Sequence, residues 1–268
     1  MAGEPISLAG AAMFSRHDLS QDHWERIAHL LPGQAGGHGG VGNDTRLFVH
    51  VIRHLAKTGI AWADLPESAG QWTSLWQRYN RWRARGVWER VAAELRDDDT
   101  EWLSVDSSCV RAHPCAAGAK KKGDGRGGQP AQALGRGCGG FGTKVHAAVN
   151  PLGHPVALHL TGANAADSPH LPALIAGVET AAVLADKGYD ADTNRQAIRS
   201  HGAEPCIPPR RNRTAVIEYD RHLYTERNAV ERFFGRVKPY RRVATRYDTK
   251  ARNFLGFVWL AAIGIMLA

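Results

Sequence analysis

The sequence lacks the features of a membrane-spanning protein and of a secreted one. Its longest strongly apolar stretch, Phe254 to Ala268, covers about fifteen residues, fewer than the roughly twenty that a bilayer span needs. The N-terminus has neither a basic segment nor a continuous apolar one, so no secretory signal is expected. We therefore interpret residues 254–268 as a buried terminal helix and expect a cytoplasmic protein.

Cysteines are few, and their spacing does not suit a structural metal site. Cys109, Cys115, Cys138 and Cys206 form no short paired spacings and have no matching histidines. A structural zinc site is therefore not expected, and reduced cytosolic thiols are the default interpretation.

Acidic residues are fewer than basic ones, and the imbalance is local. The chain has 34 Lys and Arg against 26 Asp and Glu, a net charge of +8. Residues 201–253 hold 13 Lys and Arg against 6 Asp and Glu, a surplus of 7 that is almost the whole excess. This indicates a polyanionic partner such as a nucleic-acid backbone, although a basic surface also occurs on proteins that bind nothing.

The length of 268 residues and eight tryptophans allow a sizeable core in one or two domains. Residues 1–17 show no periodicity and are expected to be a flexible extension, with Met13 as an alternative start. Residues 18–96 are expected to form a small all-α domain. The predicted helices run from Gln21 to Leu31, from Asn43 or Asp44 to a stop at Gly59, from Gln71 to Arg85, and from Val87 to Leu95.

The third of these helices is Arg-rich. We expect it to bury Trp72, Leu75, Trp76 and Tyr79, and to expose Arg78, Arg81, Arg83 and Arg85. Two amphipathic helices joined by a turn, the second of them basic, are typical of a helix-turn-helix-like DNA-binding unit, with Arg78 and Arg81 as candidate contacts. The connection from Gly59 to Gly70 is long for that motif, and a tryptophan-filled bundle packed on the next domain is the alternative.

Residues 100–268 carry strand and helix signals in a recognisable order. A strand from Trp102 to Val105 ends on Asp106, and a hairpin turns at residues 150–153. The sequence then predicts a helix over 168–179, a strand over 182–185 that runs into Asp186, a helix over 192–201 and a strand over 203–207. This order predicts an α/β fold, a ribonuclease-H-like mixed sheet with helices on both faces. The Gly-rich stretch 116–140 is expected to be a mobile loop.

A helix from Asn228 to Lys238 would carry two different stripes. Tyr224, Arg227, Glu231 and Lys238 fall on a polar stripe, and Val230, Phe233, Phe234 and Val237 fall on an apolar one. Such a helix can hold an acidic ligand beside phosphate-binding cations. The alternative is a solvated helix face on which Glu231 and Arg227 pair for a few tenths of a kcal/mol.

Three acids are candidate metal ligands. Asp106 and Asp186 each end an apolar strand, and in this topology the two strands are neighbours, so their carboxylates should converge with Glu231. Three carboxylates can serve two Mg²⁺ ions, about 3.5–4 Å apart, which points to metal-dependent phosphodiester chemistry on DNA. Asp167, Asp190 and Asp192 lie nearby in sequence, but capping or turn roles are favoured for them.

The spacing of Tyr224, Arg227, Glu231 and Lys238 resembles the signature of DDE transposases of bacterial insertion sequences. The sequence from Asp220 to Phe254 is similar to the insertion-sequence-five family in particular. The similarity continues through VDSSCVRAH, GGFGTKVHA, LADKGYDAD and IPPRRNR, and covers nearly everything from about Leu19. Ser108, Gly142 and Gly188 depart from the residues common in the family, but none of them removes a carboxylate or a signature cation.

The resemblance implies that Asp106, Asp186 and Glu231 are the catalytic residues and bind Mg²⁺ or Mn²⁺, two ions in all. It implies hydrolysis at transposon ends followed by attack of the 3′-hydroxyl on target DNA, and a homo-oligomer on double-stranded DNA. The protein would then associate with the nucleoid while bound. A plain metal-dependent nuclease, or a non-catalytic DNA-binding protein descended from a transposase, are the alternatives.

The resemblance also suggests roles for other polar residues. Arg227 and Lys238 would place phosphates, while Tyr224 supports them or only packs. The candidates for further contacts with the DNA backbone are Arg210, Arg211, Arg213, Arg241, Arg242 and Arg246. His113 and His146 could touch metal or DNA, but a hydrogen-bonded structural role is favoured for both.

Overall fold

The computed structural model describes residues 18–33, 44–118 and 131–268, and it divides into two compact units. One unit combines Met1–Leu95 with Tyr240–Val243 and Gly256–Ala268. The other combines Arg96–Pro239 with Ala244–Leu255. The expected extension over 1–17, and parts of the Gly-rich stretches after Gly33 and after Gly118, lie outside the described residues.

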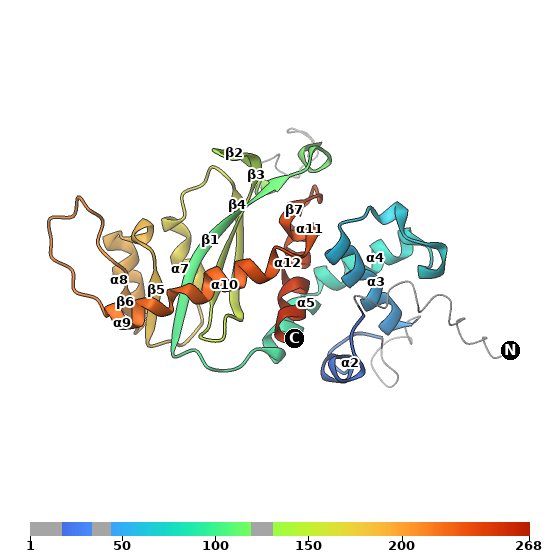
Figure 1. Cartoon of the computed structure of the whole chain (residues 1–268), viewed down its shortest axis with the longest axis horizontal. Helices are drawn as coiled ribbons and strands as arrows, with labels where there is room; N and C mark the ends of the chain where they lie inside the picture. The colour runs from blue at the N-terminus through green and yellow to red at the C-terminus, as the bar shows by residue number, and fades with distance from the viewer. Residues whose placement is uncertain (1–17, 34–43, 119–130) are drawn as a thin grey trace. The chain divides into compact units, whose positions relative to one another are not determined.

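The first unit is helical in the part of it that is described (Figure 1). Its elements are α2 (Gln21–Ala28), α3 (Thr45–Thr58), the short 3₁₀ turns η2 (Trp62–Asp64) and η3 (Glu67–Ala69), α4 (Trp72–Ala84) and α5 (Val87–Leu95). The Asp44 side chain caps α3 by accepting from the Leu47 backbone N–H at 2.9 Å, as the sequence predicts. Gly59 ends that helix in the left-handed conformation, with φ of 73°.

The buried face of α4 differs from the predicted one. Trp72 and Trp76 are 42% and 38% exposed, so the expectation that they are buried was wrong. Tyr79 and Trp82 are the buried aromatics, and the Tyr79 ring stacks on Phe257 with centroids 4.7 Å apart. The helix is therefore rotated from the tryptophan stripe towards a face centred on Tyr79 and Trp82.

The second unit is built on a mixed sheet, seven-stranded over the described residues, with the order β2-β3-β1-β5-β6 and with β4 beside β3 and β7 beside β1. The strands are β1 (Trp102–Ala112), β2 (Gly135–Gly137), β3 (Gly140–Val149), β4 (Pro155–Gly162), β5 (Ala182–Ala185), β6 (Glu204–Cys206) and β7 (Thr245–Arg246). β1 pairs antiparallel with β3 and parallel with β5. The predicted hairpin is confirmed: β3 and β4 pair antiparallel, and the Gly153 N–H donates to the Asn150 carbonyl at 2.8 Å.

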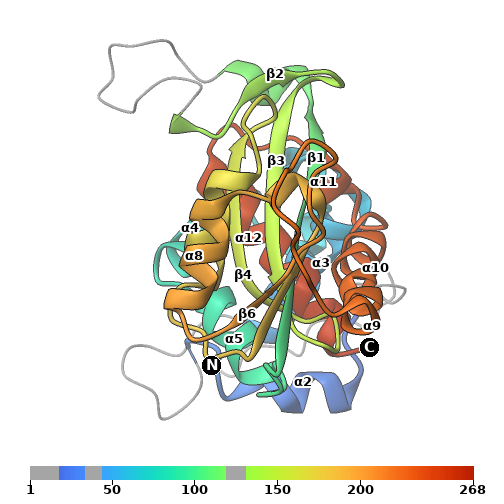
Figure 2. The same cartoon turned by 90° about the vertical axis from the view of Figure 1, so that its left-hand side faces the viewer.

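Helices cover both faces of this sheet, with α8 and α10 on opposite sides (Figure 2). The helical elements are η4 (Pro114–Gly118), η5 (Ser168–His170), α7 (Leu171–Ile175), η6 (Lys187–Tyr189), α8 (Asp192–Ser200), α9 (Arg221–Tyr224), η7 (Thr225–Arg227) and α10 (Asn228–Val237). α11 (Arg241–Ala244) and α12 (Ala251–Met266) have residues in both units. Thus the fold class predicted from element order, a mixed α/β sheet preceded by a helical region, is confirmed.

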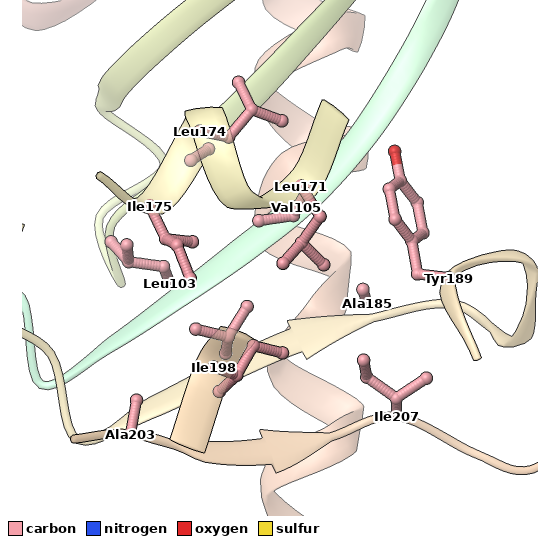
Figure 3. Close-up of a cluster of buried hydrophobic side chains, with 12 residues drawn as sticks. Leu103, Val105, Leu171, Leu174, Ile175, Ala185, Tyr189, Ile198, Ala203 and Ile207 are labelled. Atoms are coloured by element: carbon pink, nitrogen blue, oxygen red, sulfur yellow. The ribbon is translucent and has the colours of Figure 1, made fainter. Parts of the chain in front are cut away.

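The core of the second unit lies between the sheet and the helices α7 and α8 (Figure 3). Leu103 and Val105 of β1 pack there with Leu171 of α7 and Ile198 of α8, all fully buried. Because successive strand residues point to opposite faces, Ser104 and Asp106 face the other side, where α10 lies. The Ser104 hydroxyl donates to the Arg227 carbonyl at 2.8 Å, in agreement with this alternation.

Two element boundaries differ from the sequence prediction. β1 continues past Asp106 to Ala112, because its antiparallel pairing with β3 extends to Arg111 even though the apolar run stops at Val105. α7 ends at Ile175 rather than near Glu179, and Gly177 follows with a positive φ of 75°.

The terminal helix α12 is buried along almost its whole length, as predicted for residues 254–268. Over the described residues, no helix is long and apolar enough to cross a membrane.

Candidate active site

The sheet register brings Asp106 and Asp186 to neighbouring positions. Val105 pairs with Ala185 in the last register position between the parallel strands β1 and β5, and the two acids are the residues that follow. Both side chains are partly exposed. The prediction that the two strands are neighbours is therefore confirmed, although Asp106 lies within β1 rather than at its end.

Glu231 reaches the same region on α10. The buried face of that helix consists of Ala229, Val230, Phe233, Phe234 and Val237, which matches the predicted apolar stripe. Glu231 lies on the exposed face, with a side chain that is 51% exposed.

Arg227 connects the first and third acids. Its Nη1 lies 3.5 Å from Asp106 Oδ2, and its Nη2 donates to Glu231 Oε1. The side chain is only 20% exposed, so part of the ion pair is shielded from water. Its guanidinium also lies 5.8 Å from the ring centroid of Tyr224, so this signature residue has a packing contact with Arg227.

The environment of Asp106 disfavours its charged form. Burial raises the pKa of this carboxyl, and the negative charges of Asp186 and Asp167 raise it further. The Ser107 backbone N–H, which donates to Asp106 Oδ1 at 2.7 Å, and the Arg227 charge act in the opposite direction. A carboxylate crowded by other carboxylates is relieved by a bound cation, so the site suits one electrostatically.

The three carboxylates are chemically suited to bind a hard divalent cation, but Glu231 is paired with Arg227. Carboxylate oxygens are the ligands that Mg²⁺ and Mn²⁺ prefer. As the side chains stand, no group of three or more His, Cys, Asp or Glu among the described residues is arranged to hold a metal ion. The Arg227 guanidinium pairs with both Glu231 and Asp106, two of the carboxylates that would bind such a cation.

The neighbouring acids have distinct structural partners. Asp190 is 4% exposed and accepts hydrogen bonds from Arg195 and Arg213 and from the Arg210 backbone N–H, at 2.7–3.0 Å. Asp192 pairs with Arg213. These contacts support a structural role for Asp190 and Asp192, but as ion-pair partners, and Asp192 makes no capping hydrogen bond at the start of α8.

Asp167 differs from the prediction. It occupies the position before η5 but makes no capping hydrogen bond with its side chain. Its Oδ1 accepts instead from the Ser107 hydroxyl at 2.7 Å and lies 2.9 Å from Lys144 Nζ. Sequence reasoning missed Ser107 and Lys144, because their contacts with Asp167 join residues far apart in the chain.

The predicted DNA-contacting cations fall into two groups. Lys238, Arg211, Arg241 and Arg81 are exposed. Arg210 is exposed too, but its guanidinium donates to the carbonyls of Lys187 and Gly188.

The other candidate cations have internal partners. Arg242 is 4% exposed, donates to the Ile60 carbonyl and lies over Phe257, and Arg246 is fully buried. Arg78 donates to Thr45 Oγ1 and lies over Phe48. Arg213 is held by Asp190 and Asp192. The structure therefore argues against Arg242 and Arg246 as phosphate contacts. Arg78 was expected to be exposed but is only partly so.

The two histidines lie away from the three acids. His146 is fully buried, and its Nε2 lies 2.8 Å from Thr161 Oγ1. Burial and the neighbouring His170 lower its pKa to about 4, so the ring is neutral near pH 7. His113 contacts Cys115 and packs against Tyr247.

Comparison with known protein families identifies both parts of the chain. Residues 98–266 match a family model described as "Transposase DDE domain", and residues 19–92 match one described as "Putative transposase of IS4/5 family". The first match spans more than half of the chain, and the chain belongs to this family of DDE transposases. Membership implies a ribonuclease-H-like fold, DNA as substrate and dependence on divalent metal.

Individual relatives agree with this assignment. A protein of Brucella ovis named "Putative transposase for insertion sequence element IS6501" is 38% identical over 127 residues, which are 47% of this chain and 98% of the relative. "Uncharacterized protein y4sN" of Sinorhizobium fredii is 42% identical over 40% of this chain and 87% of the relative. "Transposase for insertion sequence element IS1106" of Neisseria meningitidis serogroup B is 37% identical over 35% of each chain. No solved structure matches significantly.

Proposed function

We propose that this transposase hydrolyses phosphodiester bonds at transposon ends and then joins the freed 3′-hydroxyl to target DNA, with Asp106, Asp186 and Glu231 as its catalytic residues. The observation that carries the proposal is the strand register, which places Asp106 and Asp186 side by side, together with the Arg227 link from Asp106 to Glu231. The neighbouring acids Asp167, Asp190 and Asp192 have other partners, since Asp190 and Asp192 pair with arginines and Asp167 pairs with Lys144.

The three carboxylates are the proposed ligands of two Mg²⁺ or Mn²⁺ ions. When bound, such ions activate the attacking oxygen and stabilise the leaving oxygen of an in-line displacement at phosphorus. For Glu231 to act as a ligand, the Arg227 guanidinium must leave it. A DNA phosphate offers Arg227 an equivalent charge-assisted partner, so the arrival of DNA would free the third carboxylate.

DNA would be held by the exposed cations and by the helical region. Lys238, Arg211 and Arg241 surround α10 in sequence, and Arg81 lies on α4. We propose residues 18–96 as the DNA-binding domain and residues 100–268 as the catalytic domain. Pairing of two transposon ends would require a homo-oligomer on DNA.

A strand-transfer assay tests the function. The purified chain, Mg²⁺, pre-nicked DNA carrying the element's own ends and a circular target plasmid are incubated together and separated on a gel. We expect joined products, because the 3′-hydroxyl attacks the target with the same ligands that serve hydrolysis. Cleavage of intact ends without joined products would identify a nuclease instead. The absence of both cleaved and joined products would contradict the proposal.

The same assay, with intact DNA ends in place of pre-nicked ones, tests Glu231 directly. Glu231→Gln should lower cleavage by about a thousandfold or more, since it removes one anionic ligand while keeping the side-chain shape. Glu226→Gln, which changes an exposed glutamate five residues earlier, is the matched control and should cleave at the wild-type rate. Circular dichroism should show that both variants fold, and Mg²⁺-dependent cleavage by Glu231→Gln would remove Glu231 from the catalytic set.

A further inference from the structure

Asp167 contacts the back of the strand that carries Asp106. The side chain of Ser107 faces the α7 side of the sheet, like Leu103 and Val105 of the core, whereas Asp106 faces α10. The Ser107 hydroxyl donates to Asp167 Oδ1 at 2.7 Å. The two acids therefore lie on opposite faces of β1 and are linked through one serine.

Lys144 holds Asp167 in this place. Its Nζ lies 2.9 Å from Asp167 Oδ1 and also donates to the Ala165 carbonyl at 2.7 Å. The Lys144 side chain is only 12% exposed and that of Asp167 is 34% exposed, so the pair is partly shielded. A lysine with its ammonium mostly removed from water requires a carboxylate partner, which fixes the position of Asp167.

Ser107 in turn holds the Asp106 carboxylate. The Ser107 backbone N–H donates to Asp106 Oδ1 at 2.7 Å, while the hydroxyl of the same residue is bound by Asp167. A serine whose side chain is anchored holds its own backbone N–H, and so this hydrogen bond to Asp106, with less freedom. A metal ligand must be oriented as well as present, so the hydrogen bond between Ser107 and Asp167 should strengthen metal binding by Asp106.

We propose that Asp167, held by Lys144, is a positioning residue that orients the metal-binding carboxylate of Asp106 through Ser107. The inference rests on the proposed function, in which Asp106 binds a divalent cation. Asp167 does not touch the metal in this arrangement. Asp167 fixes Ser107, and the Ser107 backbone N–H fixes the Asp106 carboxylate. The charge of Asp167 also adds to the negative potential that attracts a cation.

Titration of the full-length chain with Mn²⁺, with free Mn²⁺ followed by electron paramagnetic resonance, tests the proposal without DNA or turnover, because Asp106 and Asp186 alone can bind one ion while Arg227 still pairs with Glu231. Ser107→Ala and Asp167→Asn should each raise the Mn²⁺ dissociation constant about tenfold, the lower end of the usual range for residues that orient a ligand. Ser107→Thr keeps the hydroxyl and should restore wild-type affinity. Glu179→Gln, which changes an exposed acid in the same unit, is the charge control and should bind as the wild type does.

Thermal unfolding without metal separates positioning from a merely structural role. Ser107→Ala removes one hydroxyl, so its unfolding temperature should stay close to that of the wild type even if Asp167→Asn fails to fold. Wild-type Mn²⁺ affinity in folded Ser107→Ala, with binding lost in Asp106→Asn, would overturn the positioning role and leave the proposed function standing. Unchanged Mn²⁺ binding in Asp106→Asn would overturn both.

Discussion

Arg227 shows how one residue can serve a site in two states. Burial acts to lower the pKa of its guanidinium, but the hydrogen bond and charge of Glu231 raise it above the ordinary value, so it stays charged. In the structure it offsets the negative charge of Asp106 and Glu231. The same charge can pair with a DNA phosphate, which is the exchange that the proposed function requires.

Asp190 and Asp192 share Arg213 but differ in burial, which makes them a matched pair for a stability measurement. Asp190→Asn should lower the free energy of unfolding by about 3–5 kcal/mol, because it leaves the buried Arg195 without its carboxylate. Asp192 has a side chain that is 86% exposed, and Asp192→Asn should cost less than about 1 kcal/mol. Urea unfolding at pH 7 checks both values, and equal stabilities would contradict a structural role for Asp190.

The Asp190 carboxyl should also make the free energy of unfolding depend on pH. Burial acts to raise the pKa of Asp190, but hydrogen bonds from Arg213, the Arg210 backbone and Arg195 together hold it below its ordinary value. Its stabilising contribution is therefore complete above the unfolded pKa of about 4 and is lost as the pH falls through the lower folded pKa. The stability difference between wild type and Asp190→Asn should accordingly shrink in acid.

At the scale of elements, α4 offers the clearest test of the observed packing. Trp82 is 2% exposed, between Phe48 and Trp88 with ring centroids 4.9 and 5.4 Å away, whereas Trp76 is 38% exposed. Trp82→Ala should cost about 3–5 kcal/mol of unfolding free energy, and Trp76→Ala no more than about 1 kcal/mol. The reverse order in chemical denaturation would support the stripe expected from the sequence.

Elements whose pattern and caps agree could be predicted from the sequence. The apolar stripe of α10 and the Asp44 and Gly59 ends of α3 are local signals, and the structure has each of them. For α4 the aromatic residues allowed more than one face, and packing of Tyr79 on Phe257, far along the chain, decided between them. β1 was predicted too short because antiparallel pairing continues through polar residues that carry no apolar signal.

For the candidate site, too, local signals in the sequence could be read, but contacts between distant residues could not. Asp106, Asp186 and Glu231 were predicted from apolar strand patterns, helix spacing and the resemblance to DDE transposases, and their catalytic role stays a prediction. The contact of Ser107 with Asp167 joins residues 60 positions apart and depends on the sheet register, which composition does not reveal. Likewise, a cluster of arginines in sequence cannot distinguish the exposed Arg241 from its buried neighbour Arg242.

At the scale of the whole molecule, basic charge serves both binding and folding. The surplus in residues 201–253 suggests a DNA partner, yet Arg242 and Arg246 within it are buried and hold backbone carbonyls. The cations available to phosphates are therefore fewer than the sequence count. The family matches cover residues 19–92 and 98–266, which include parts of both units.

Metal-directed cleavage of the polypeptide tests most directly whether the three acids share one metal site. The chain is loaded with Fe²⁺ in place of Mg²⁺, in the presence of a DNA end, and treated with ascorbate and peroxide, so that the backbone is cut near the bound ion. We predict cuts close to Asp106, Asp186 and Glu231 that excess Mg²⁺ suppresses and that Asp106→Asn abolishes. Cuts near only one of the three, or at unrelated positions, would contradict a shared site.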